Sequence, residues 1–194
     1  VRVYGAVMMK YLNKDIWFKA PLIKPKITLS NNYFLVGKNR QTKWSITPNA
    51  RIISHNYYVH DLKELREFES FFNDKKARVK SFFIPSHTKD IISLKAPNGV
   101  TSFKVISSNK PFWIYNQTRH LIFNKKFASQ VLDIKQIQDY EEIVLKDPLP
   151  FEIDKNTLIE ELINVRFNRD EIEFIKSGAV GFRTNLDFKE VFYE

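Results

Sequence analysis

Apolar and polar residues alternate along most of this chain, in short runs that end at proline, glycine or asparagine. The clearest run covers residues 50–59, where the side-chain character changes at almost every position. Alternation with a period of two predicts a β-strand that turns one face toward a core. The two predicted faces carry Ile52, Ser54, Asn56 and Tyr58 on one side, and Arg51, Ile53, His55, Tyr57 and Val59 on the other.

Further strands are predicted wherever β-branched and aromatic residues recur between turn formers. Residues 130–138 alternate strictly, which indicates a strand, whereas residues 157–163 fit either a short helix or a strand. The last thirty or so residues are typical of three antiparallel strands. The other predicted strands cover residues 16–20, 26–30, 33–36, 44–46, 79–84, 91–95, 100–107, 111–115, 120–123, 142–145, 162–167, 172–175 and 180–192.

One helix is predicted over about residues 61–73. Asp61 can accept hydrogen bonds from the first-turn amides, and Glu64, three residues later, completes the spacing of a capping box. The apolar stripe has helical spacing, and charged residues flank it. It consists of Leu62, Leu65, Phe68, Phe71 and Phe72. We therefore expect a mainly β, α+β protein, with antiparallel β-sandwich or barrel-like sheets and one prominent helix packed on a sheet.

Charge is distributed unevenly along the sequence. The chain has 31 Lys and Arg against 22 Asp and Glu, a net charge of +9. Residues 1–110 hold 20 basic and 7 acidic residues (+13), and residues 111–194 hold 11 and 15 (−4). We expect a basic part, 1–110, and an acidic part, 111–194, within two domains or one continuous domain. The basic part favours a nucleic-acid surface, contact with an acidic part of a neighbouring subunit, or simply a solvated face.

Motifs for catalysis or cofactor binding are sparse. The sequence has no cysteine, which excludes disulfides, thiolate metal sites and a cysteine nucleophile, and its five glycines form no phosphate-binding loop. His55, His60, His87 and His120 lack the spacing of metal ligands. The run from Ser86 to Asp90 combines a serine, a histidine and an acid, but a polar turn after Pro85 is expected there. We expect no metal, no cofactor and no small-molecule substrate.

Two further patterns leave alternatives open. Glu171 and Glu173 would share one face of a strand, as a metal-dependent nuclease requires, although a solvated hairpin has the same pattern. Aromatic residues beside basic ones could stack single-stranded bases, although core packing explains most of them. These aromatic residues are Tyr57, Tyr58, Phe82, Phe83, Trp113 and Tyr115.

Two segments resemble proteins of tailed-bacteriophage tails. Residues 64–86, ELREFESFFNDKKARVKSFFIPS, contain a helix ending in Phe-Phe, then a basic turn, then a strand ending near Pro85 and Asp90. Residues 164–174, NVRFNRDEIEF, with 186–194, LDFKEVFYE, are similar to the closing hairpin and last strand of such proteins. Ala77 stands where the family often has glycine in the basic turn, which is a departure from the pattern.

The resemblance implies a structural virion component without enzymatic activity, of the distal-tail, baseplate-hub or adaptor type. Such a protein would form a homo-oligomeric ring that links the tail tube to hub, fibre and other tail-tip proteins, after assembly in the host cytoplasm. It would have no membrane partner, since no apolar run approaches the length that spans a bilayer. Lys75, Lys76 and Arg78 are the candidate inter-subunit contacts, with a solvated basic turn as the alternative reading. A single-stranded nucleic-acid-binding protein is the alternative function, and a nuclease is the third.

Overall fold

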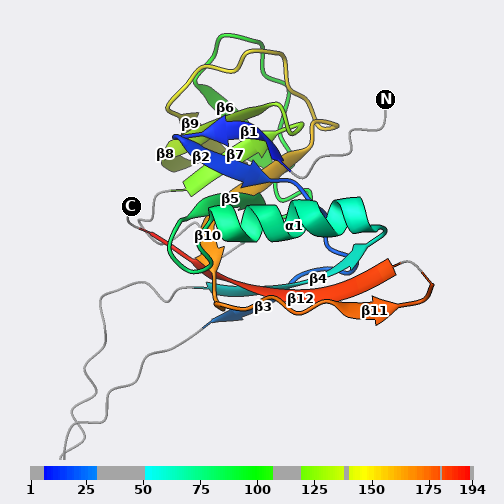
Figure 1. Ribbon diagram of the computed structural model, residues 1–194. Helices are drawn as coiled ribbons and strands as arrows, with labels where there is room; N and C mark the ends of the chain where they lie inside the picture. The colour runs from blue at the N-terminus through cyan, green and yellow to red at the C-terminus, as the bar shows by residue number, and fades with distance from the viewer. Residues whose placement is uncertain (1–6, 30–50, 107–118, 138–139, 180, 193–194) are drawn as a thin grey trace, which may run out of the picture. The chain divides into compact units, whose positions relative to one another are not determined.

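The computed structural model describes residues 7–29, 51–106, 119–137, 140–179 and 181–192 (Figure 1). Within these ranges it has twelve strands and one α-helix, so the predicted mainly β, α+β class is confirmed. The strands predicted at 33–36, 44–46 and 111–115 lie outside the described residues. No helix in the described ranges is long and apolar enough to cross a lipid bilayer.

The chain divides into two compact units, each built from two separate segments. Unit 1 consists of Val1–Lys19 and Phe82–Asn164, and unit 2 of Ala20–Ser81 and Val165–Glu194. Unit 1 holds 14 basic and 11 acidic residues (+3), and unit 2 holds 17 and 11 (+6). Charge that is segregated along the sequence is therefore not segregated between the units. The division proposed after Lys110 lies outside the described residues and stays a prediction.

Unit 1 is a mostly antiparallel sheet in the order β1-β2-β5-β10-β7-β8-β9-β6. One pair in it is parallel, β2 with β5, where Ile16 lies opposite Phe83. Residues 159–163 belong to strand β10, so the segment 157–163 forms part of a strand and not a helix. The bounds are β1 Val7–Tyr11, β2 Lys14–Trp17, β5 Phe82–Pro85, β6 Ser102–Ile106, β7 Arg119–Phe123, β8 Phe127–Ile137, β9 Tyr140–Leu145 and β10 Ile159–Phe167.

Isolated bridges add a further connection to this sheet. Ile91 bridges Ile159 of β10, and Ser93 bridges Val105 of β6, so residues 91–93 link the last strand of the sheet back to β10. The enclosed side chains are aliphatic and aromatic, and their burial supplies the main stabilisation of the unit. The core comprises Ile91, Ala96, Phe103, Val105, Leu121, Phe123, Val131, Ile143, Leu145, Leu149, Ile153 and Ile159.

The strand predicted over 130–138 is present as part of β8, but a β-bulge breaks its strict alternation of faces. Val131 pairs with Leu145 and Asp133 with Val144, which leaves Leu132 as the extra residue. One extra residue exchanges the two faces of a strand. As a result, Leu132 is exposed, whereas Val131 and Ile134, three positions apart, both pack on the core.

Unit 2 is a sheet with one helix on one of its faces (Figure 1). The sheet contains β3 (Lys26–Leu29), β4 (Arg51–Val59), β12 (Gly181–Glu190), β11 (Ile175–Ser177) and the last three residues of β10. All of these pairs are antiparallel. The predicted helix is present as α1 (Leu62–Asp74).

The face of β4 that carries Ile53, His55, Tyr57 and Val59 is buried, as its alternation predicts. Phe68, Phe71 and Phe72 of α1 are buried as well, but Leu62, at the first helical position, is exposed. Edge-to-face ring pairs join helix and sheet, with Tyr57 against Phe68 and Phe72 against Phe167. The opposite face of the sheet has no described element of this unit over it.

Candidate functional site

The basic turn, residues 75–80, leaves the C-terminal end of α1 toward β5. At the other end of the helix, Asp61 accepts from the Glu64 amide at 2.8 Å, and the Glu64 carboxylate accepts from the His60 amide at 2.7 Å. This reciprocal cap fixes where the helix begins. The apolar stripe holds the helix against the sheet, and the two constraints together set where the basic turn emerges.

Left-handed backbone defines the shape of this turn. Lys76 has φ 48° and Ala77 has φ 51°, a region that glycine adopts freely and other residues adopt at a cost of about 1–2 kcal/mol each. Amide hydrogen bonds keep the turn closed, from Ala77 to the Phe72 carbonyl at 3.2 Å and from Lys80 to the Lys75 carbonyl at 2.9 Å. Ala77 therefore takes the conformation for which glycine is the usual residue.

Lys75 is the most enclosed cation of the turn, with 5% of its surface exposed. Its Nζ lies 2.8 Å from the Asp74 carboxylate and 5.0 Å from the centre of the Phe71 ring. The hydrogen bond from Lys75 lowers the pKa of Asp74, and Lys80 adds a smaller effect from 3.5 Å. Lys75 thus stabilises the end of the helix and offers little surface to another molecule.

Arg78 and Lys76 are the accessible cations. Arg78 donates from Nε to Oδ1 of Asp170 at 2.7 Å and from Nη2 to Oδ2, and both side chains are more than half exposed. An exposed ion pair of this kind contributes little to stability, so a competing carboxylate can replace Asp170 at little cost. Lys76 is exposed and forms no ion pair with any residue in the described ranges. The three candidate residues therefore lie together but differ in availability.

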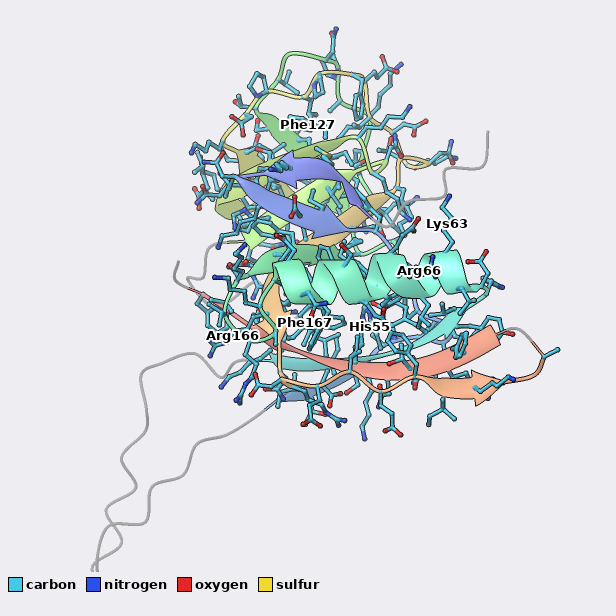
Figure 2. The ribbon with its side chains drawn as sticks, in the orientation of Figure 1. His55, Lys63, Arg66, Phe127, Arg166 and Phe167 are labelled. Atoms are coloured by element: carbon cyan, nitrogen blue, oxygen red, sulfur yellow. The ribbon has the colours of Figure 1, made fainter. Side chains whose placement is uncertain are left out.

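The histidines do not converge on one site. His55 is buried under α1 in unit 2, where its Nδ1 lies 2.7 Å from the Tyr57 hydroxyl (Figure 2). His120 is in unit 1, with its Nδ1 3.1 Å from the Tyr11 hydroxyl. Burial lowers the pKa of His120, and also that of His87, to about 4. Among the described residues, no three histidine, aspartate or glutamate side chains form a group that could hold a metal ion.

The run from Ser86 to Asp90 forms a polar turn. Asp90 accepts from the Ser86 hydroxyl, from the Thr88 hydroxyl at 2.8 Å and from the Glu161 amide at 2.7 Å. His87 at the tip has φ 57°. The serine therefore bonds to the carboxylate of its own turn and is not aligned with a histidine as a nucleophile would be.

Neither pattern considered for nucleic-acid chemistry takes the expected form. Glu171 and Glu173 are exposed and precede β11, which begins only at Ile175, so the expected strand over 172–175 is wrong and the two glutamates share no strand face. Tyr57, Phe82 and Phe83 are at most 2% exposed and belong to the cores of their units, so they cannot stack bases. Tyr58 keeps partial exposure, while Trp113 and Tyr115 lie outside the described residues.

Two adjacent glutamates of β10, Glu160 and Glu161, are buried, although glutamate is usually a surface residue. Glu161 lies 2.8 Å from Nη1 of Arg119, and both side chains are close to 10% exposed. Glu160 is 1% exposed, and burial raises its pKa, partly offset by Lys125. The sequence feature that could have predicted this burial is a Glu-Glu pair inside an otherwise apolar run, because such a run indicates a strand with both faces covered.

No protein-family model and no curated protein matches this chain. The class that the fold defines is thus a mainly β, α+β protein with an exposed basic turn.

Proposed function

We propose that the protein is a structural, non-enzymatic component of a bacteriophage tail that forms a ring at the distal tail or baseplate. The observation that carries this proposal is the order of helix α1, basic turn and strand β5, ending at Pro85, in the segment that resembles phage tail proteins. The left-handed backbone at Ala77 agrees with the glycine that such proteins often have there. The ring links the tail tube to the tail-tip proteins, and the protein is located in the virion.

In this proposal the basic turn supplies contacts between neighbouring subunits. Lys76 and Arg78 are exposed, and Arg78 exchanges the Asp170 carboxylate for one on the neighbour. Such an exchange costs little free energy, because a surface ion pair contributes little to stability both in the free subunit and in the ring. Rim charges of this kind set the register and the rate of association more than they set affinity.

Light scattering and electron microscopy of the purified chain test this proposal. Wild-type protein is expected to form closed rings. The double variant Lys76→Glu, Arg78→Glu should need a protein concentration at least tenfold higher to form them. Lys63→Glu, an exposed change on α1, is the matched control and should leave assembly unchanged. A strict monomer under all conditions, together with its absence from purified virions by mass spectrometry, would reject the proposal.

Single-stranded nucleic-acid binding is the second candidate, and the net positive charge of both units favours it. The burial of Tyr57, Phe82 and Phe83 removes three of the side chains on which bases would stack. Binding that depends on charge alone falls steeply with salt. Fluorescence anisotropy with an oligonucleotide at low salt decides the matter, and no binding there eliminates this candidate.

A further inference from the structure

The face of the unit 2 sheet opposite α1, here called the uncovered face because no described element of this unit lies over it, has a corner where basic residues gather, at the ends of β3, β12 and β10. Residues paired across neighbouring strands share a face, so their alignment can be followed across the sheet. One row runs from Thr28 through Ile52 and Lys189 to Arg166. Lys26 belongs to the next row, opposite Ser54. We name these five residues, Lys26, Thr28, Ile52, Arg166 and Lys189, the basic corner; Arg166 is labelled in Figure 2.

Arg166 and Lys189 are direct cross-strand partners of like charge. Like charges opposite each other destabilise a sheet, and opposite charges at such positions stabilise it. No described residue forms an ion pair with either side chain. The sequence therefore keeps an unfavourable pair on an uncovered face, and departures from local rules of this kind are expected where a surface has a function.

The nearby carboxylates are already engaged. Asp187, in the row beside Lys189, accepts from the Ser54 hydroxyl at 2.6 Å and lies 2.9 Å from Nη2 of Arg169. Glu190 follows Lys189 but turns to the opposite face, where it binds Arg51. The exposed Glu171 and Glu173 belong to the segment between β10 and β11, which leads away from the corner toward Arg183. Asp187 shares the row of Lys26 through Ser54, so the three cations of the basic corner face one carboxylate, and that carboxylate is already bound to Ser54 and Arg169.

We propose that the basic corner is a docking surface for an acidic protein partner that presents two acidic residues whose Cβ atoms lie about 5 Å apart. That spacing matches a cross-strand pair and is also the distance between glutamates one helical turn apart. Arg166 receives one carboxylate through its planar fork, and Lys189 receives the other as a point charge. The proposal does not depend on a place in a phage tail.

A protein partner fits this surface better than a nucleic acid. Tyr58, the aromatic residue on the uncovered face of β4, lies at the far end of that strand and packs edge-on against His60, with 4.9 Å between ring centres. A single strand would need several stacking platforms along its path. An acidic protein surface needs no stacking platforms, only complementary charge.

Site-resolved NMR titration of the full chain with a short poly(L-glutamate) peptide tests the proposal. Amide shifts are expected to concentrate at Thr28, Ile52, Arg166 and Lys189, with binding that weakens as salt is added. An oligothymidylate of equal charge is the second arm and should bind at least tenfold more weakly. Shifts spread over the whole surface, or tighter binding of the oligonucleotide at this corner, would overturn the proposal.

Charge reversal separates docking from folding. Lys189→Glu places opposite charges across from each other, so we expect a higher urea midpoint together with at least tenfold weaker peptide binding. Lys63→Glu makes the same charge change on α1 and should bind as wild type does. If Lys189→Glu and wild type bind the peptide equally well, the corner is only a solvated surface and the proposal fails.

Discussion

Arg51, at the start of β4, forms a bidentate ion pair with Glu190, at the end of β12. Its Nη2 lies 2.6 Å from Oε1 and its Nε 2.8 Å from Oε2, and the Arg51 amide also donates to Oε2 at 3.2 Å. The two side chains are only 14% and 9% exposed. A contact between residues 139 positions apart thus fixes the register of the two central strands of unit 2.

Glu190→Gln is therefore expected to lower the free energy of unfolding by about 2 kcal/mol, because it removes the negative charge that binds a largely buried guanidinium through two hydrogen bonds. Urea denaturation measures the change. Glu152→Gln is the matched control, since its pair with Lys95 is 3.1 Å long but 74% and 58% exposed. That variant should change stability by less than about 1 kcal/mol. Equal effects of the two substitutions would contradict the role assigned to the Arg51–Glu190 pair.

Ala77→Gly should stabilise the protein by about 1 kcal/mol. The backbone at Ala77 has φ 51°, where alanine has a steric cost that glycine avoids. This gain exceeds the free energy lost because glycine has a larger conformational entropy in the unfolded chain. Thermal unfolding would show a higher midpoint. Ala179→Gly is a suitable control, because Ala179 is exposed and does not have a positive φ. A lower midpoint for Ala77→Gly would show that the turn adopts another conformation.

Acid should destabilise unit 1 through two histidines. Burial lowers the pKa of His120 and of His87 to about 4. Between this pH and the ordinary pKa of 6.5, the unfolded chain therefore binds more protons at these two residues than the folded chain does. Stability from these groups is complete above pH 6.5 and is lost as the pH falls toward 4, by about 3 kcal/mol for each. Urea midpoints measured across this range should fall in wild type. His120→Gln and His87→Asn should each remove about half of that slope, and an unchanged slope in both variants would refute the assignment.

Neighbouring glutamates of β10 should respond oppositely to the same substitution. Burial raises the pKa of Glu160, so its ionisation costs stability as the pH rises above the ordinary value of 4.5. Glu160→Gln is therefore expected to stabilise the protein at pH 7 and to have no effect at pH values well below 4.5. Glu161→Gln should destabilise it at pH 7, because it weakens the contact with Arg119. Denaturation of both variants at two pH values measures this, and destabilisation by Glu160→Gln at pH 7 would contradict it.

Local rules predicted much of the fold. The cap at Asp61 and the stripe of phenylalanines located α1, and the alternation in 50–59 identified the buried face of β4. The bulge at Leu132 was not predicted because it depends on how β8 pairs with β9. The alternation of side chains within β8 does not reveal that pairing. The start of β11 was missed in the same way, since its register is set by β12.

The candidate site shows the same limit. Three basic residues of one turn look alike in the sequence, yet Lys75 packs on Phe71 while Lys76 and Arg78 remain accessible. The basic corner could not be found from the sequence at all, because Lys26, Arg166 and Lys189 come from three distant segments.

The sequence by itself determined that this protein is mainly β with one capped helix, and that cysteine chemistry is absent from it. These properties depend on side-chain periodicity and residue type, which are local. Only the tertiary structure decided that Ile91 meets Ile159, that Glu190 meets Arg51 and that Lys189 faces Arg166. Such contacts join residues far apart in the chain, and they are selected by the packing of a whole unit and not by any short segment.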